Sequence, residues 1–327
     1  MYKDYQKKVD NDNDNDLDKY EFKITFIGNC NVGKTTILNN IIGEKILPQS
    51  STKNTSLIFR IKNSSSYSIY NVKNNKEVSL IDINSNDTIQ TKMHKIVEEL
   101  NNVYRSKQKK EINSDYQLNI PIKNILHYNV ILQDTPGLDE EITKYDTIIK
   151  EIVDTHVIYY IFKLDSIKDE LLTFQNVLKF ISISNSNLLN NIYIIINQCD
   201  NFENIFADSR EPILFDTYIN EQKNEIKKIL KEYDIKNNNF ITLSNSNKNN
   251  NDKNNDMSKL FYNINKVISD KVNIINKYYE IATNTIKSEV VYTIDFRKLD
   301  EQISENIKSR LDELWKIYID DETKKMF

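Results

Sequence analysis

The eight residues 28–35, GNCNVGKT, constrain the fold of this chain more than any other segment. They match the pattern G-x-x-x-x-G-K-[ST], and they lie between an apolar run at Phe22–Ile27 and a helical pattern at Thr35–Ile42. In a strand, loop and helix of this kind, backbone N–H groups and the N-terminus of the helix surround a phosphate group. The segment therefore predicts a phosphate-binding loop in an α/β domain.

Glycine is rare in this chain, and its positions support that interpretation. The 327 residues include four glycines, at positions 28, 33, 43 and 137. The first two frame the loop, the third follows the predicted helix, and the fourth ends the sequence DTPG at 134–137. Glycine is needed where the backbone takes a positive φ or lies against a ligand. In a chain with so few glycines, an accidental glycine turn before a helix is the weaker alternative.

Apolar runs that alternate with helical patterns predict the fold class. The strand-like runs are Phe22–Ile27, Ser56–Ile61, Tyr128–Leu132, Val157–Phe162, Ile192–Ile196 and Phe240–Leu243. Helical patterns cover residues 35–42, 88–105, 144–154, 168–182 and 215–233. This alternation is typical of an α/β domain that has a mostly parallel central sheet with helices on both faces.

The composition shifts along the chain and predicts three further segments. Residues 1–20 are rich in Asp and Asn and should form a disordered tail, and the Asn-rich residues 245–256 should form a disordered surface loop. Residues 286–327 should form a helical extension, because apolar residues recur there at spacings of three and four. This extension either packs against the preceding domain, which we place at residues 21–285, or belongs to a stalk or a partner-binding helix.

Charge and hydropathy exclude several classes of function. The net charge of −4 at pH 7 argues against nucleic-acid binding. No apolar run has the length of a membrane span and no apolar signal core starts the chain, so we expect no membrane-spanning helix. Peripheral membrane association stays open, although nothing in the sequence supports it. Cys30 and Cys199 fall in separate motifs, which argues against a structural disulfide and predicts a cytoplasmic protein. His94, His127 and His156 lack metal-ligand spacing.

Four residues near the loop suit phosphate and magnesium chemistry. Lys34 would reach the β and γ oxygens of a nucleotide, and the Thr35 hydroxyl would bind Mg²⁺. Asp134 follows the apolar run Val130–Leu132 and suits an aspartate that holds Mg²⁺ through water. The N–H of Gly137 would approach the γ-phosphate, and hydrolysis would release the loop that follows.

A further motif, NQCD at 197–200, directly follows the apolar run Tyr193–Ile196. It resembles the N/T-K-x-D element with which GTPases recognise guanine, where the aspartate accepts hydrogen bonds from N1 and N2 of the base. It begins 63 residues beyond Asp134 (197 − 134). Gln198 replaces the usual lysine, so its aliphatic stem can cover the base but the positive charge is missing. Ser244, after the last strand-like run, would help to cover the base.

The distance between the first two motifs predicts the family. From Gly28 to Asp134 there are 106 residues (134 − 28), which leaves room for a long insertion with its own helix. This spacing, the sequence ILP at 46–48 and the run from Ile120 to Leu138 resemble the dynamin superfamily, especially its bacterial and mitofusin-like members. The resemblance implies a P-loop GTPase fold that hydrolyses GTP to GDP and phosphate. It also implies a slow basal rate that rises when two G domains form a homodimer.

The resemblance also assigns roles within the site. In the family, a threonine seven residues after the Leu-Pro pair completes the Mg²⁺ shell and positions the attacking water, which implies Thr55, with Thr52 as the alternative. An asparagine at position 31 resembles potassium-activated GTPases, where it helps to bind K⁺, and a loop-capping role is the alternative. Cys30 departs from the polar residue that the family commonly has there. The implied metal ligands are Thr35, Thr55 and Asp134, and the implied catalytic residues are Lys34, Thr55 and Asn31. The residues that the resemblance implies in contact with the nucleotide are Gly28, Asn29, Cys30, Asn31, Val32, Gly33, Lys34, Thr35, Thr36, Gly137, Asn197, Gln198, Asp200 and Ser244.

Three other functions are alternatives to a dynamin-like GTPase. A nucleotide-dependent binding module with negligible hydrolysis is favoured by Cys30 and Gln198. An immunity-type or septin-like GTPase also carries a DTPG element, but the long insertion argues against it. A P-loop ATPase would share the phosphate loop alone. Nothing in the sequence resembles a lipid-binding paddle, so we do not expect membrane fission or fusion by this chain alone.

Overall fold

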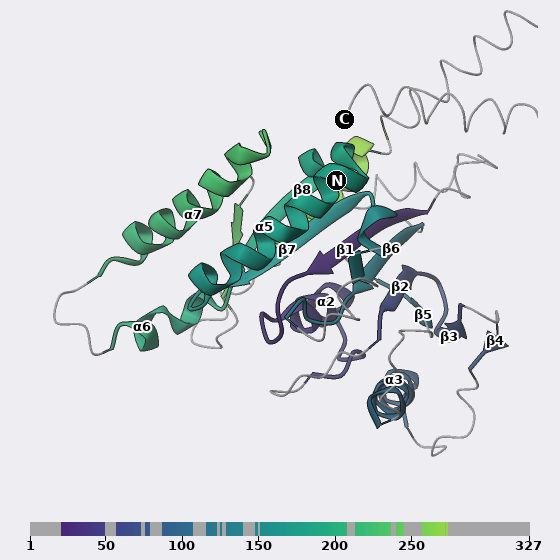
Figure 1. Ribbon diagram of the computed structural model, residues 1–327. Helices are drawn as coiled ribbons and strands as arrows, with labels where there is room; N and C mark the ends of the chain where they lie inside the picture. Colours follow the sequence, from purple (N-terminus) through teal and green to yellow (C-terminus); the bar gives the residue numbers. More distant parts are fainter. Residues whose placement is uncertain are drawn as a thin grey trace, which may run out of the picture. The chain divides into compact units, whose positions relative to one another are not determined.

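The structure is a computed structural model (Figure 1). It describes residues 21–49, 57–72, 76–78, 87–106, 116–122, 125, 129–139, 148–149, 151–207, 213–236, 240–244, 257–271 and 273. The chain forms two compact units, Met1–Phe261 and Tyr262–Phe327. Within the second unit the described residues 262–271 are helical. The predicted tail, the Asn-rich loop, the C-terminal extension and the predicted boundary at 285 lie outside the described residues.

A nine-stranded sheet organises the described part of the first unit, in the order β4-β3-β5-β2-β6-β1-β7-β8-β9. Its strands are β1 (Phe22–Ile27), β2 (Phe59–Asn63), β3 (Ser68–Asn71), β4 (Lys76–Glu77), β5 (Tyr116–Ile120), β6 (Val130–Asp134), β7 (Val157–Lys163), β8 (Ile192–Asn197) and β9 (Phe240–Thr242). The pairs β6-β1, β1-β7, β7-β8, β8-β9 and β2-β5 are parallel. The pairs β2-β6, β3-β5 and β3-β4 are antiparallel, so one half of the sheet is mixed.

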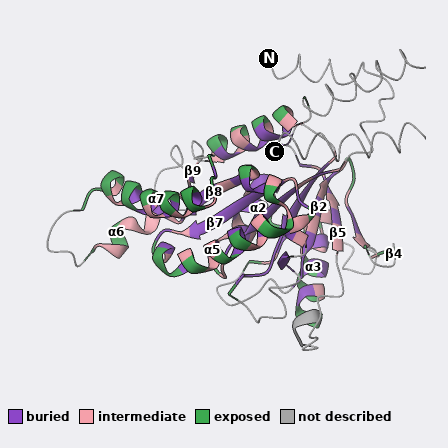
Figure 2. Ribbon diagram, turned by 45° about the horizontal axis from the view of Figure 1, so that its top comes forward, coloured by how far each residue is buried: buried purple, intermediate pink, exposed green. Residues whose placement is uncertain are grey.

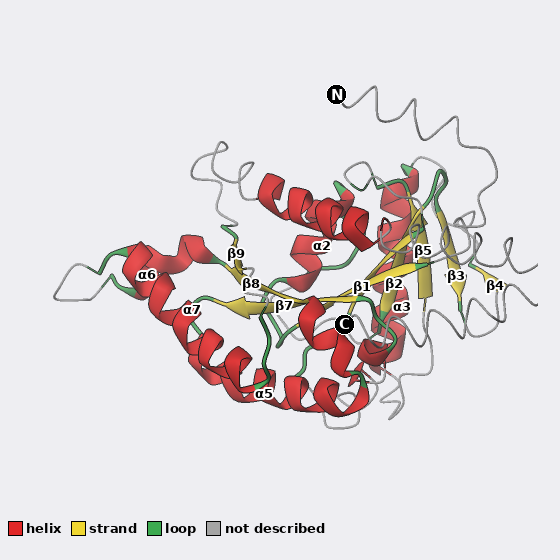
Figure 3. Ribbon diagram, turned by 90° about the horizontal axis from the view of Figure 1, so that it is seen from above, coloured by secondary structure: helices red, strands yellow, loops and turns green. Residues whose placement is uncertain are grey.

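Helices cover both faces of the parallel half. Figure 3 shows α2 on one face and α5 and α7 on the other, and Figure 2 shows that their outer sides are exposed while the strands are buried. The helices are α2 (Lys34–Ile42), α3 (Ile89–Ser106), α5 (Ile167–Ser184), α6 (Phe202–Ile205) and α7 (Phe215–Glu232), with the 3₁₀ turns η2 (Ser186–Asn191) and η3 (Cys199–Asn201). Residues 148–149, 151–153 and 257–271 are also helical.

The core forms around β7 because this strand is apolar on both faces. Residues 157–162 are all fully buried, which is expected for a central strand of a parallel sheet covered on both sides. On the face that carries α5, the Tyr160 and Phe162 rings contact the ring of Phe174, with centroids 4.5 and 5.2 Å apart. Such aromatic pairs add to the free energy gained by burying apolar surface. The core therefore fixes α5 against the middle of the sheet.

The predicted fold class is confirmed, and two details of the prediction are wrong. The strand expected at 56–61 is β2, at Phe59–Asn63, and β3, β4 and β5 were not predicted. Strand β2 is antiparallel to its neighbour because Phe59 pairs with Asp134. Strand β2 thus starts at the edge of the sheet where β6 ends. The chain between α2 and β2 therefore has to return to that edge. Alternation of strands and helices could not reveal this reversal.

We expect Phe174→Ala to lower the free energy of unfolding by about 3–5 kcal/mol, because it leaves a cavity against the Tyr160 and Phe162 rings. Phe174→Leu should cost much less, since most of the volume is kept. Urea denaturation followed by circular dichroism measures both. Leu172→Ala is the control, because this side chain of the same helix is 68% exposed. Equal losses for Phe174→Ala and Leu172→Ala would contradict the placement of α5.

Candidate nucleotide-binding site

Glycine is required in the phosphate loop by close contacts with neighbouring strands. Gly28 follows β1, and a Cβ atom there would lie 2.4 Å from the carbonyl oxygen of Ile161 in β7. Gly33 has a φ of 94° at the start of α2, and a Cβ atom there would lie 2.3 Å from Nδ2 of Asn197. Neither approach is open to a residue with a side chain. Both glycines let the loop lie against the ends of adjacent strands.

Lys34, the first residue of α2, is held over this loop. Its Nζ donates hydrogen bonds to the carbonyl oxygens of Gly28 at 3.0 Å and Asn29 at 2.8 Å. The residue is 6% exposed, so the ammonium group is largely withdrawn from water. A buried cation beside the N-terminus of a nine-residue helix makes this loop attractive to an anion.

Thr35 and Asp134 meet directly beneath the loop. The Thr35 hydroxyl donates a hydrogen bond of 2.9 Å to Oδ2 of Asp134. The parallel pairing of β1 with β6 places Asp134 beside Phe26, at the strand end nearest the loop. Asp134 is 1% exposed, and its other oxygen, Oδ1, is buried without a hydrogen-bond partner. Burial raises the pKa of Asp134 to about 6, although Lys34 and the hydrogen bonds from Thr35 and the Thr135 N–H act in the opposite direction.

This pair fits a hard divalent cation such as Mg²⁺. A hydroxyl and a carboxylate with an unpartnered buried oxygen are the oxygen donors that Mg²⁺ prefers. Within the described residues, no group of three or more His, Cys, Asp or Glu side chains is placed to hold a metal ion. The remaining ligands would therefore have to come from phosphate oxygens, water or the undescribed residues. Mg²⁺ commonly keeps several waters and binds phosphates in this way.

The loop that follows β6 packs onto the phosphate loop. The N–H of Leu138 donates to the Gly28 carbonyl at 3.2 Å, and the Cys30 N–H donates to Oδ1 of Asp139 at 2.6 Å. A Cβ atom on Gly137 would lie 2.3 Å from Sγ of Cys30 and 2.7 Å from its backbone nitrogen. Asp139 was not predicted from the sequence. Its carboxylate accepts from a loop N–H of the kind that binds phosphate oxygens.

The end of β8 supports the phosphate loop from the opposite side. Asn197 is fully buried, and its Nδ2 donates to the Val32 carbonyl at 2.7 Å. Gln198 takes a φ of 59°, and its Nε2 donates to the Asn31 carbonyl at 3.0 Å. The two residues that the sequence placed near a base therefore also fix the loop. Since the Cys199 N–H donates to the Leu243 carbonyl, the loop that carries Ser244 lies beside this motif.

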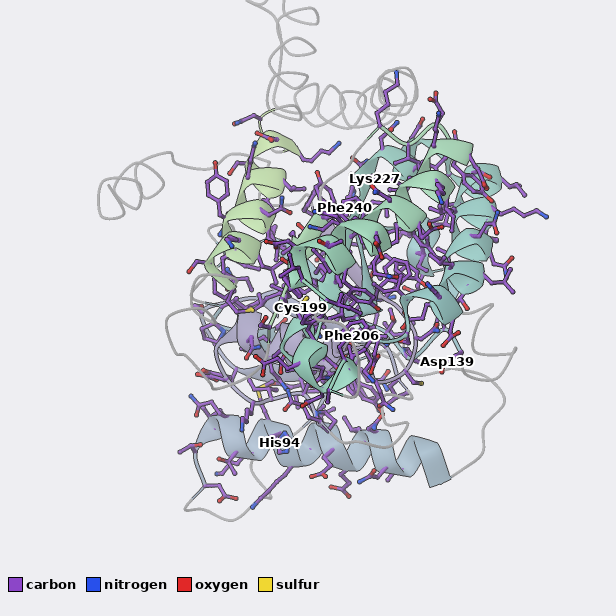
Figure 4. The ribbon with its side chains drawn as sticks, turned by 90° about the vertical axis from the view of Figure 1, so that its left-hand side faces the viewer. His94, Asp139, Cys199, Phe206, Lys227 and Phe240 are labelled. Atoms are coloured by element: carbon purple, nitrogen blue, oxygen red, sulfur yellow. The ribbon has the colours of Figure 1, made fainter. Side chains whose placement is uncertain are left out.

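The other predicted site residues have varied surroundings. Asn29 has a buried Oδ1 without a hydrogen-bond partner, whereas Asn31 is exposed and takes a φ of 61°. Thr36 lies half-buried in the first turn of α2, and Asp200 lies in η3. Neither Cys30 nor Cys199 forms a disulfide bond in the described part of the chain (Figure 4 labels Cys199). Both candidate switch threonines, 52 and 55, lie outside the described residues.

A buried carboxylate in α5 also belongs to this region and was missed. Glu170 is 3% exposed; Oε1 accepts from the Ser166 hydroxyl at 2.5 Å, and Oε2 is buried without a partner. Burial is the largest influence on the pKa of Glu170 and raises it to about 7. Hydrogen bonds from the Ser166 hydroxyl and the Lys163 N–H lower this pKa, as does the positive charge of Lys34, whereas the negative charge of Asp139 raises it. A glutamate in the first turn of a helix is too common a pattern to have revealed this environment.

The sequence of residues 24–198 matches the model of the Dynamin family, which covers more than half of the 327 residues. The chain belongs to the dynamin family. The match extends from β1 through the phosphate loop and the DTPG motif to Gln198, so the dynamin-family domain includes the whole described site up to that residue. No protein with a curated description matches the sequence.

Solved structures resemble this dynamin-family chain at low sequence identity. An oligomerised bacterial dynamin pair is 15% identical, with a TM-score of 0.47, over 98% of this chain and 49% of that one. This chain thus spans about half the length of that bacterial dynamin. Toc33 from Arabidopsis thaliana in complex with Mg²⁺ and GMPPNP is 12% identical, with a TM-score of 0.41, over 75% of this chain and 77% of that one. Among the described residues, no helix is both long and apolar enough to cross a bilayer.

We expect Glu170→Gln to change how stability depends on pH. The pKa of Glu170 is raised from 4.5 to about 7 in the folded state, so the folded protein binds a proton that the unfolded chain has lost between these values. The free energy of unfolding therefore falls as the pH rises from about 4.5 to 7. The contribution of this group to that fall is at most on the order of 3 kcal/mol. Glu170→Gln removes this loss, so the variant should gain stability over the wild type as the pH rises. Denaturation at pH 5, 6, 7 and 8 measures the difference.

The control for this prediction is Asp169→Asn, which changes an exposed carboxylate in the same turn of α5. Its stability relative to the wild type should vary little over the same pH range. A Glu170→Gln variant that behaves like this control would contradict the burial of Glu170, in which Oε2 has no hydrogen-bond partner.

Proposed function

We propose that this chain is a magnesium-dependent GTPase that hydrolyses GTP to GDP and phosphate. The observation that carries the proposal is the hydrogen bond of 2.9 Å between Thr35 and Asp134 beneath the phosphate loop. It joins the hydroxyl and carboxylate that a nucleotide-bound Mg²⁺ requires, next to a buried lysine. Membership of the dynamin family supports the same reaction.

The predicted site residues would each bind a different part of the nucleotide and its Mg²⁺ ion. Lys34 would exchange its two carbonyl partners for the β and γ oxygens, because phosphate offers a stronger charge-assisted hydrogen bond. Thr35 would bind Mg²⁺ directly, and Asp134 would hold it through water. The backbone of Gly137 would contact the γ-phosphate. Thr55, or Thr52 in its place, would complete the metal shell and position the attacking water.

Guanine recognition would use the end of β8. Asp200 would accept hydrogen bonds from the base, and Ser244 would lie over it, because the Cys199–Leu243 hydrogen bond brings the two loops together. Gln198 donates to the Asn31 carbonyl, and its stem would cover the base as the lysine of the usual motif does. Adenine lacks the N1 and N2 donors that Asp200 needs, so GTP should bind better than ATP.

Activation would come from a second G domain and from a monovalent cation. Asn31 is exposed at the tip of the loop, where a K⁺ ligand would be needed, and K⁺ would offset the charge that develops between the β and γ phosphates. We place the protein in the cytoplasm, with a homodimer of G domains as the active form. Peripheral membrane association is a further proposal that the liposome arm below tests.

A nucleotide-controlled binding module with negligible hydrolysis is the second candidate. It is favoured by the position of Cys30, whose Sγ would lie 2.3 Å from a Cβ atom on Gly137, because a thiol is only a weak hydrogen-bond partner for an attacking water at that place. A single-turnover measurement separates the two candidates. A binding module would retain GTP, whereas a slow enzyme would convert all of it to GDP.

We expect Asp134→Asn to reduce Mg²⁺-dependent GTP turnover by about a hundredfold or more, because the amide cannot hold the metal-bound water with a charge. Phosphate release with GTP and with ATP, at several Mg²⁺ concentrations, measures this effect and the choice of base. The variant should stay folded, since a neutral amide avoids the cost of burying a carboxylate. Asp216→Asn, at an exposed residue in α7, is the control. Wild-type activity in Asp134→Asn, or equal turnover of ATP, would contradict the assignment.

We expect the GTP turnover per molecule to rise with protein concentration, and to be higher in K⁺ than in Na⁺ at equal ionic strength. The rise would reflect dimerisation of G domains, and the K⁺ preference would reflect the Asn31 side chain. Asn31→Ser should abolish the K⁺ preference. A parallel series with anionic liposomes tests membrane association. Turnover that is independent of concentration, of the cation and of liposomes would remove all three proposals and leave the basal reaction.

A further inference from the structure

The carboxylate of Asp139 occupies a hydrogen-bond donor of the phosphate loop. The Cys30 N–H donates to Oδ1 of Asp139 at 2.6 Å (Figure 4 labels Asp139). A backbone N–H carries a single hydrogen and needs a nearly straight bond, so a phosphate oxygen bound by this N–H would stand where Oδ1 stands. Carboxylates and phosphates are both anionic acceptors. Asp139 and a phosphate group therefore compete for the Cys30 N–H.

The backbone before Asp139 fixes where this carboxylate lies. Leu138 is 4% exposed, and its N–H donates to the Gly28 carbonyl at 3.2 Å. A Cβ atom on Gly137 would lie 2.7 Å from the Cys30 nitrogen and 2.7 Å from Oδ1 of Asp139. The Gly137 backbone, the Cys30 N–H and the Asp139 carboxylate thus meet in one small space. In the proposed function, this space beside Gly137 is where the γ-phosphate binds.

The negative charge of Asp139 acts on the interior of the site, although the side chain itself is exposed. It raises the pKa of Glu170, which is 3% exposed, and the positive charge of Lys34 lowers the same pKa. Like charges that approach closely repel each other, most strongly where water is excluded. A γ-phosphate at this place would add negative charge next to Asp139. The β-phosphate would lie farther away, because it would not contact Gly137.

We propose that Asp139 sets the preference of the site between GDP and GTP, because its carboxylate holds the Cys30 N–H until a γ-phosphate displaces it. The proposal rests on the proposed GTPase function. GDP has no γ-phosphate and binds while Asp139 keeps its hydrogen bond, whereas GTP has to break that bond. Asp139 is therefore a specificity-determining residue that weakens the binding of GTP selectively. Its displacement also frees the loop at 137–139 from one bond to the phosphate loop, which lets the loop respond to the γ-phosphate.

The test compares the affinities for two ligands in the full chain with Mg²⁺ present. These are GDP and GMPPNP, a GTP analogue that carries a γ-phosphate and resists hydrolysis. Asp139→Asn keeps the size of the side chain and an acceptor oxygen but removes the charge. We expect the affinity for GMPPNP to rise about tenfold, because the bond to be broken is no longer charge-assisted. The affinity for GDP should stay within about twofold. Isothermal titration calorimetry measures both.

A matched variant separates this effect from a general change in charge. Asp165 follows β7 at the same edge of the sheet as the phosphate loop, and its carboxylate pairs with Lys163 at 2.7 Å. Asp165→Asn should leave the ratio of the two affinities unchanged. Asp139→Ala removes the acceptor as well as the charge and should change the ratio at least as much as Asp139→Asn. An unchanged ratio in both Asp139 variants, or an equal loss of affinity for GDP and GMPPNP, would overturn the proposal.

Amide hydrogen exchange tests the contact itself without a nucleotide. Peptides that cover residues 28–34 should exchange faster in Asp139→Ala than in the wild type, because the Cys30 N–H loses its acceptor. Peptides from α7 should exchange at the wild-type rate. Equal exchange of residues 28–34 in the two proteins would contradict the hydrogen bond on which the proposal depends.

The two proposals can fail separately. If the wild type binds both nucleotides and Asp139→Asn leaves the ratio unchanged, the GTPase proposal stands and the role of Asp139 is rejected. If the wild type binds neither nucleotide, the GTPase proposal fails. The role of Asp139 is then judged with tripolyphosphate, which has no base, and it is rejected unless Asp139→Asn binds this anion about tenfold more tightly than the wild type does.

Discussion

The site depends on the way the phosphate loop is held between the ends of neighbouring strands. Asn197 binds the Val32 carbonyl at 2.7 Å from one side, and Leu138 binds the Gly28 carbonyl at 3.2 Å from the other. These bonds satisfy the carbonyl oxygens of Val32 and Gly28, so the loop is fixed from both sides. The two glycines make the approach possible, because a Cβ atom at either position would collide with a neighbouring strand.

Buried charge is concentrated around this loop, and each charge depends on the others. Asp134 and Glu170 are almost completely buried, each has one oxygen without a partner, and burial raises the pKa of both. Lys34 acts on both carboxylates in the opposite direction. The buried carboxylates therefore carry an electrostatic cost that a cation bound beside them would offset, so cation binding and stability should be linked.

Much of the site could be predicted because its residues are required by local chemistry. Lys34, Thr35 and Asp134 stand at fixed distances from glycines and strand ends, and the structure brings them together. The order of motifs also predicted the family. The antiparallel direction of β2 relative to β6 could not be predicted. It depends on the edge of the sheet to which the preceding chain returns, and a short apolar run shows the same pattern in either direction. Asp139 was missed because a carboxylate two residues after a glycine is an ordinary loop residue until the fold places it 2.6 Å from the Cys30 nitrogen.

The sequence by itself determined the phosphate-loop motif and the alternation of strands and helices, and it predicted which residues would hold a metal ion and a base. These depend on backbone freedom and on residue type, which are local properties. Only the tertiary structure decided that Glu170 is buried within range of the charge of Lys34 and that Gln90 and His94 contact the Glu44 side chain and the Ile46 carbonyl. Those contacts join residues far apart in the chain, and polar residues carry no periodic pattern that would predict their partners.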